Sequence, residues 1–137
     1  MNKNKPILLV EDDTVDAMTV KRALKEIHVN NRLDIVKNGE EALEYLQKDS
    51  AEPPCIILLD INMPKMNGIE FLKVARNEAL LERIPVVVLT TSKNDEDVIE
   101  SFKLCVAGYI LKPVTYTEFI ETVKTIELYW TLSELPN

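Results

Sequence analysis

Glycine is scarce in this chain of 137 residues, which contains only Gly39, Gly68 and Gly108. The three lie far apart, so neither the GxGxxG turn of dinucleotide-binding folds nor the GxxxxGK[ST] phosphate loop can form. The scarcity therefore argues against the usual dinucleotide and P-loop nucleotide chemistry.

Cysteine and histidine are scarcer still. Cys55 and Cys105 form neither a CxxC motif nor a metal-binding spacing, so we expect reduced, structural thiols in a cytoplasmic protein. The single histidine, His28, follows an apolar helix face and has no ligand-like neighbours. It is best interpreted as a surface or helix-end residue, and not as a metal ligand or a phosphorelay histidine.

Long hydrophobic runs and an excess of positive charge are also lacking. No apolar stretch is long enough to span a bilayer, and the N-terminal MNKNKP has no signal-peptide hydrophobic region. Acidic residues number 23 and basic residues 16, for a net charge of −7, whereas nucleic-acid surfaces need clustered lysine and arginine. We therefore expect neither a membrane nor a nucleic-acid partner.

What the chain does contain is five short aliphatic runs with helix-like patterns between them. The runs are Pro6–Val10, Leu33–Val36, Ile56–Leu59, Pro85–Leu89 and Gly108–Leu111. Apolar residues at helical spacing lie between and after them: Val20, Ala23, Leu24 and Ile27; Ala42, Leu43 and Leu46; Phe71, Leu72 and Ala75; Val98, Ile99 and Phe102; Phe119, Val123 and Ile126. The alternation predicts an α/β fold with a parallel sheet covered on both faces, for which the doubly wound strand order 2-1-3-4-5 is a hypothesis.

Polar side chains follow four of these five runs. They are Glu11, Asp12 and Asp13 after the first, Asp60 after the third, Thr90 after the fourth and Lys112 after the fifth. In the proposed sheet these residues converge on one edge, where several carboxylates would repel one another unless a cation lay between them. Oxygen ligands without histidine or cysteine favour a hard ion, Mg²⁺ before Ca²⁺.

Such a group has the parts needed to accept a phosphoryl group. Asp60 would be the nucleophile, a role that carboxylates take in other covalent mechanisms. Lys112 and the metal would neutralise the phosphoryl oxygens, and Thr90 would donate a hydrogen bond to one of them.

Four motifs carry a resemblance to a known family. ILLVEDD, LLDINMPKMNG, VVVLTTS and YILKP resemble, in order and spacing, the receiver domain of two-component response regulators, from about Lys5 to Ile126. The resemblance implies a flavodoxin-like three-layer sandwich, with a five-stranded parallel sheet in the order 2-1-3-4-5 and five helices. It also implies a single, stand-alone receiver domain over 1–137, with a core of about 5–126 and a C-terminal helix and tail over 127–137.

The resemblance gives roles to the residues around Asp60. It implies that Asp60 accepts a phosphoryl group from a histidine kinase's phosphohistidine. Asp12 would bind Mg²⁺ directly, Glu11 through a water molecule and Asn62 through its backbone carbonyl. Met63, Pro64 and Gly68 match the loop that shapes the site.

Further roles fall on the last two strands. Thr90 and Tyr109 match the family's hydroxyl and aromatic switch pair, and Lys112 matches its site lysine, with a cis peptide bond expected between Lys112 and Pro113. Thr91 occupies a position that guards access to the aspartate, and Asn62 and Ser92 occupy two positions that tune dephosphorylation.

A finer resemblance concerns partners. RIPVVVLTTS, DEDVI and IELYW resemble single-domain regulators paired with phytochrome-type histidine kinases. A homodimer through the fourth helix, fifth strand and fifth helix is a further expectation, in which Glu96, Asp97 and Glu100 either stay solvated or pair with basic residues. The aromatic and apolar tail residues Tyr129, Trp130, Leu132 and Leu135 either fold back on their own domain or contact a partner.

Several alternatives stay open. Asp13 is either a third ligand or a helix cap, and Tyr109 either a switch residue or ordinary core. A haloacid-dehalogenase-type phosphatase would want a second aspartate where Asn62 stands, and FMN binding would be opposed by the acids after the first strand. A degenerate receiver that only binds partners is disfavoured by the complete set of Asp12, Asp60, Thr90 and Lys112.

Overall fold

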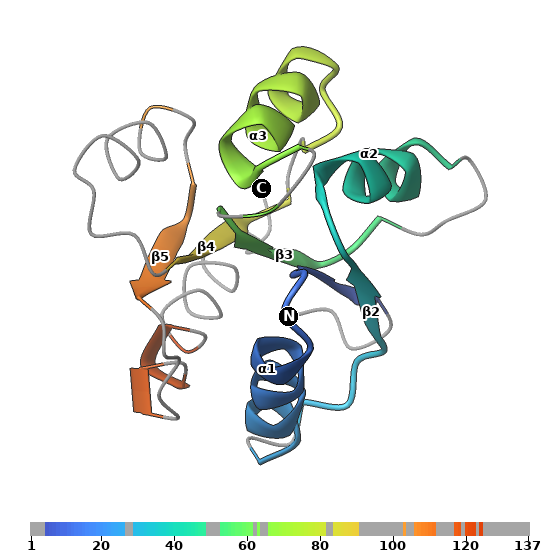
Figure 1. Ribbon diagram of the computed structural model, residues 1–137. Helices are drawn as coiled ribbons and strands as arrows, with labels where there is room; N and C mark the ends of the chain where they lie inside the picture. Colours follow the sequence, from blue (N-terminus) through green and yellow to red (C-terminus); the bar gives the residue numbers. More distant parts are fainter. Residues whose placement is uncertain are drawn as a thin grey trace, which may run out of the picture.

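Five parallel strands and three helices make up most of the described chain. The computed structural model describes residues 5–26, 29–48, 53–61, 63, 66–81, 84–90, 103, 106–111, 117–118, 120–122 and 124. In order, the elements are β1 (Ile7–Val10), α1 (Thr14–Glu26), β2 (Leu33–Val36), α2 (Gly39–Gln47), β3 (Ile56–Asp60), α3 (Gly68–Asn77), β4 (Val86–Thr90) and β5 (Gly108–Leu111) (Figure 1). All pairings are parallel and the strand order is β2-β1-β3-β4-β5, so the predicted order is confirmed.

The predicted fourth and fifth helices fall mostly on residues outside this description. Helical backbone is found at residue 103 and at 117–118, 120–122 and 124. In the second of these regions the Thr122 hydroxyl donates a hydrogen bond of 2.9 Å to the Glu118 carbonyl, the i to i+4 relation of an α-helix. The sequence of Thr115–Glu118 also fits a capping box, but its first two residues lie outside the described part.

Strand boundaries differ from the prediction by one residue, and proline explains two of the differences. β1 begins at Ile7 and not at Pro6, and β4 begins at Val86 and not at Pro85. Proline has no N–H to donate to a neighbouring strand, so each of these two prolines lies just before its strand and not within it.

Alternate strand residues pack on opposite faces of the sheet. One face carries the cluster that includes α1: Ile7, Leu9, Ala17, Val20, Ala23, Leu24, Cys55, Ile56, Leu58, Val87, Leu89 and Ile110. The other face carries the cluster that includes α2 and α3: Leu8, Val10, Ala42, Ile57, Leu59, Met63, Phe71, Leu72, Ala75, Leu81, Ile84 and Val86. Helices therefore lie on both sides of the sheet, α1 on one and α2 and α3 on the other (Figure 1). Since both faces are covered, the central strands are apolar up to their last residues and show no alternation in sequence.

The three helices begin at the same edge of the sheet, each after a short polar side chain. The Asp13 carboxylate accepts hydrogen bonds from the backbone N–H groups of Val15 and Asp16, at 2.8 and 3.1 Å. Asn38 caps α2, and Asn67 caps α3 in a full capping box with Glu70. Each side chain satisfies N–H groups that the first turn leaves without a helical partner.

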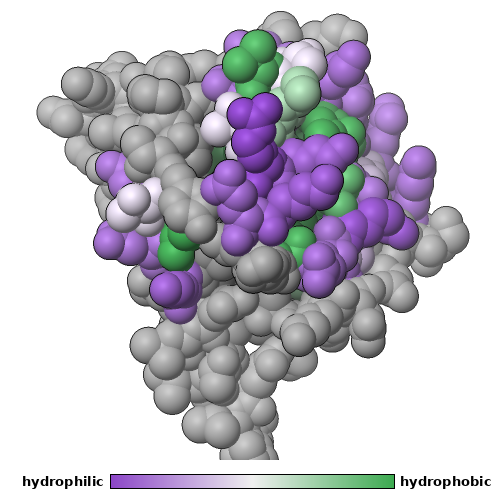
Figure 2. Space-filling model, turned by 90° about the horizontal axis from the view of Figure 1, so that it is seen from below, coloured by the Kyte–Doolittle hydropathy of each residue, from purple (hydrophilic) through white to green (hydrophobic). Residues whose placement is uncertain are grey.

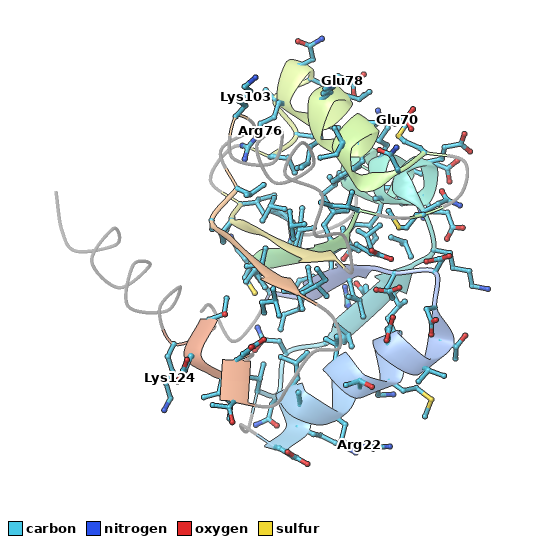
Figure 3. The ribbon with its side chains drawn as sticks, turned by 60° about the vertical axis from the view of Figure 1, so that its left-hand side comes forward. Arg22, Glu70, Arg76, Glu78, Lys103 and Lys124 are labelled. Carbon is cyan, nitrogen blue, oxygen red and sulfur yellow. The ribbon has the colours of Figure 1, made fainter. Side chains whose placement is uncertain are left out.

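Polar side chains cover the outside of these layers. On the side of α1, hydrophobic atoms of the described surface lie between hydrophilic ones (Figure 2). Arg22 on that side, and Glu70, Arg76 and Glu78 on the opposite side, project away from the sheet (Figure 3). Among the described residues, none of the helices has the length and apolar character needed to cross a membrane.

Candidate functional site

Strand register brings the acidic residues to one edge. Val10 of β1 pairs with Leu59 of β3, so the next residues, Glu11 and Asp60, lie at the same level at the carboxyl ends of these strands. β1 and β3 are neighbours here because the direction of winding reverses between them, and the carboxyl ends at such a switch point are where doubly wound folds bind ligands.

Three carboxylates meet at this edge. Glu11, Asp12 and Asp60 each offer an oxygen, and these oxygens all lie within 4.8 Å of one another. Asp60 and Glu11 are 3% and 2% exposed, whereas Asp12 is exposed. The group therefore combines two buried carboxylates with one that is exposed to solvent.

The segment after β1 is held by backbone and side-chain hydrogen bonds. The Glu11 N–H donates to the Val36 carbonyl at 2.9 Å, and the Glu11 Oε1 accepts from the Asp13 N–H at 3.1 Å. Asp13 itself is the cap of α1 and is not among the three clustered acids. Of its two interpretations, the helix cap is therefore the one that these contacts support.

The segment after β3 is held tightly against Asp60. The Gly68 N–H donates to the Ile61 carbonyl at 2.9 Å. A Cβ atom at Gly68 would lie 2.6 Å from the Asp60 carbonyl oxygen and 2.8 Å from the Ile61 Cα, which is too close for any residue except glycine. Met63 is buried in the core cluster that includes residues of α2 and α3, and its role in the shaping loop stays a prediction. Asn62 and Pro64 lie outside the described residues.

Of the residues predicted to form the switch pair and the site lysine, the structure describes only some. Thr90 is the last residue of β4 and pairs with Leu111, and Tyr109 pairs with Val88, so both strands end at the edge that carries Asp60. The structure describes only the backbone of Thr90 and Tyr109. Lys112, Pro113, Thr91 and Ser92, like His28, Cys105 and the residues after 124, lie outside the described part.

The three clustered acids fit a small hard cation. Two oxygens on opposite sides of a Mg²⁺ ion, each about 2.1 Å from it, lie about 4.2 Å apart, a little less than the 4.8 Å limit found here. All three donors are carboxylate oxygens, the ligands that Mg²⁺ prefers.

Comparison with known proteins agrees with this geometry. The protein-family model of the response regulator receiver domain matches residues 7–124 of this chain. The chain belongs to the receiver-domain family of two-component response regulators. Receiver domains accept phosphoryl groups from histidine kinases and bind Mg²⁺ at an acidic pocket, and they act as signalling proteins.

Individual relatives of this receiver domain are also response regulators. Response regulator Rcp1 from Synechocystis is 40% identical over 133 residues, covering 94% of this chain and 90% of Rcp1. The structure of the phosphorylated cyanobacterial phytochrome response regulator RcpA is 39% identical, with a TM-score of 0.78, and covers 93% of this chain and 94% of RcpA. The Mn²⁺-bound form of Rcp1 is also 39% identical, with a TM-score of 0.76, and covers 97% of both chains.

Proposed function

We propose that this receiver domain takes a phosphoryl group from a histidine kinase onto Asp60, with Mg²⁺ held by Asp12, Asp60, the Asn62 backbone carbonyl and, through water, Glu11. The observation that carries the proposal is the meeting of Glu11, Asp12 and Asp60 at the switch point of the sheet. Bound there, the ion would neutralise charge on the phosphoryl oxygens.

The proposed chemistry is a displacement at phosphorus. An Asp60 carboxylate oxygen attacks the phosphorus atom of a phosphohistidine, an O–P bond forms, and the P–N bond breaks with its electron pair returning to the imidazole nitrogen. Lys112 would provide the second positive charge and Thr90 a hydrogen bond to a phosphoryl oxygen. Thr90 and Tyr109 would then change position together and carry the signal.

Burial of Asp60 supports the role of nucleophile. The residue is 3% exposed and stands at the end of the otherwise apolar strand β3. The neighbouring Asp12 is exposed, so an ion can enter from solvent beside it. A buried nucleophile beside an accessible metal ligand is the arrangement that phosphoryl transfer needs, because the reaction depends chiefly on positioning and on compensation of charge.

The acceptor assignment is tested with a small-molecule phosphodonor such as acetyl phosphate. We expect Mg²⁺-dependent labelling of the wild-type chain and none of Asp60→Asn, which keeps the shape of the side chain but removes the nucleophile. Asp13→Asn is the matched control, because asparagine also caps helices well and the change removes one charge near the site. Labelling that persists in Asp60→Asn would show that another group is the acceptor.

We further propose that the kinase is of the phytochrome type, since the relative RcpA is a cyanobacterial phytochrome response regulator. A purified phytochrome-type kinase should transfer its phosphoryl group to this chain faster than a histidine kinase with another sensor type. Equal transfer rates from both would contradict this assignment and leave the role of Asp60 untouched.

A further inference from the structure

The turn between β2 and α2 connects the two acidic segments although it contributes none of the three carboxylates. At one end of the turn, the Val36 carbonyl accepts the hydrogen bond from the Glu11 N–H at 2.9 Å. At its other end, the Gly39 N–H donates to the Met66 carbonyl at 3.0 Å. Met66 precedes Gly68 by two residues, and Gly68 lies against the Asp60 backbone.

Gly39 approaches Met66 too closely for a side chain. A Cβ atom at Gly39 would lie 2.7 Å from the Met66 Cγ and 2.9 Å from the Met66 carbonyl oxygen. The Met66 side chain could move aside, but its carbonyl oxygen could yield only if the backbone of the loop moved. None of the described glycines has a positive φ, so space, and not backbone conformation, is what requires glycine here.

Helix preference would not select glycine at this position. Gly39 is the first residue of α2, after the Asn38 cap, where alanine would form a helix more readily. Asn38 is 6% exposed, and its Oδ1 accepts from the Glu41 N–H at 3.0 Å, so the turn is anchored on the α2 side. A side chain at Gly39 would therefore push the Met66 loop and not its own helix.

We propose that Gly39 is a positioning residue for the metal site. Its contact with Met66 sets the distance between the Asp60 segment and the Glu11–Asp12 segment, and so sets the Mg²⁺ affinity. The route runs from Gly39 to the Met66 carbonyl, along the chain to Gly68, and from Gly68 to the backbone of Asp60. This inference rests on the proposed metal site and adds a residue that does not touch the ion.

The first test compares Mg²⁺ affinities measured by isothermal titration calorimetry. Outer groups that orient ligands typically change metal affinity by about 10- to 100-fold, and we expect Gly39→Ala to raise the Mg²⁺ dissociation constant by about 10-fold. Gly108→Ala is the matched control, because a Cβ atom there meets nothing within 4 Å; it should bind Mg²⁺ as the wild type does. A folded Gly39→Ala chain with unchanged affinity would overturn the proposal.

A second test uses the wild-type chain, so it does not depend on how the variants fold. With three glycines in the sequence, a ¹⁵N-glycine-labelled chain gives three backbone amide signals. We expect the Gly39 and Gly68 signals to shift along the same Mg²⁺ saturation curve, and the Gly39 amide to exchange with solvent more slowly when Mg²⁺ is bound, because linkage is reciprocal. A Gly39 signal that does not respond to saturating Mg²⁺ would also overturn the proposal.

Asp12→Asn separates failure of this proposal from failure of the site. If Asp12→Asn binds Mg²⁺ as tightly as the wild type, the metal site itself is wrongly assigned and Gly39 loses its role with it. If Asp12→Asn weakens binding and Gly39→Ala does not, the site stands and the positioning role is refuted. Weaker binding in both variants, with Gly108→Ala unchanged, supports both proposals.

Discussion

Tyr45 and Asp34 form a side-chain pair that links α2 to the edge strand β2. The Tyr45 hydroxyl donates to the Asp34 carboxylate at 2.6 Å, and Arg32 donates to the same carboxylate from the exposed side at 3.0 Å. Partial burial by itself raises the pKa of Asp34, but the hydrogen bonds from Tyr45 and Arg32 outweigh it and hold the pKa below its ordinary value. Burial, followed by the hydrogen bond to Asp34, raises the pKa of Tyr45 to about 12.

Removal of the Tyr45 hydroxyl should cost stability in a pH-dependent way. We expect Tyr45→Phe to lower the free energy of unfolding by about 1 kcal/mol at pH 7, allowing for solvent screening of this half-buried pair. Because the folded-state pKa of Tyr45 is raised above the ordinary value of 10, its contribution is complete below pH 10 and is lost as the pH rises toward about 12. Urea titrations of both chains from pH 7 to pH 12 measure this difference.

The two stability curves should therefore converge at high pH. A difference between wild type and Tyr45→Phe that stays constant up to pH 12 would contradict the expected role of the hydroxyl. The Arg32–Asp34 ion pair lies at the surface and is expected to add little, since exposed pairs are weak.

At the scale of a single element, α3 is followed by an alanine in the left-handed conformation. Ala79 has a φ of 57°, a left-handed conformation that usually falls to glycine. Its N–H donates to the Arg76 carbonyl at 3.2 Å, and the Leu80 N–H donates to the Ala75 carbonyl at 2.9 Å. These two bonds make a complete Schellman motif, with alanine at the position that glycine normally occupies.

Replacement of Ala79 by glycine should stabilise the protein. The left-handed conformation costs an L-residue about 1–2 kcal/mol, a cost that glycine does not have. Glycine also has more conformational freedom in the unfolded chain, which lowers the free energy of unfolding by about 0.4–1 kcal/mol. We expect a net gain of about 0.5–1 kcal/mol, measured as a higher midpoint of thermal unfolding. Ala23→Gly inside α1 is the control and should lose about 1 kcal/mol or more, because glycine there meets ordinary helical geometry. A lower midpoint for Ala79→Gly would contradict the strain argument.

Regular elements were predictable because each has a local cause. The five aliphatic runs became the five strands to within one residue, and Val20, Ala23 and Leu24 face the core from α1 as their spacing predicts. The capping box of Asn67 and Glu70 has a readable sequence signal that our interpretation did not use. The Schellman motif at Ala79 has no such signal, because the residue that marks it is not glycine.

The part of the candidate site that could be predicted is the set of residues at the carboxyl ends of the strands. Asp12 and Asp60 could be brought together from sequence because parallel strands end at a common edge. Close contacts between distant segments, such as Gly39 with Met66 and Tyr45 with Asp34, depend on how helices sit on the sheet, and no local pattern carries that information. The roles of Lys112, Thr90 and Tyr109 stay predictions.

At the scale of the whole molecule, net charge bears on self-association. Each chain carries a net charge of −7, so two copies repel each other at long range. A dimer through the fourth helix, fifth strand and fifth helix stays a proposal, and it has two possible sources of attraction. Apolar tail residues such as Trp130 would attract by burial, whereas Glu96, Asp97 and Glu100 would attract by pairing with basic residues.

Salt dependence distinguishes these two sources. We expect beryllofluoride, a mimic of the phosphoryl group, to shift the sedimentation mass from monomer toward dimer in the presence of Mg²⁺. Raising the ionic strength from about 0.01 to about 0.15 M shortens the screening length from about 30 to about 8 Å, which weakens the repulsion between the chains. A dimer held by the apolar tail should therefore strengthen with salt and be lost when residues 127–137 are removed, whereas one held by ion pairs should weaken with salt and survive the truncation. Asp60→Asn is the control that should not respond to beryllofluoride, and a wild-type mass that stays monomeric under all of these conditions would remove the dimer proposal.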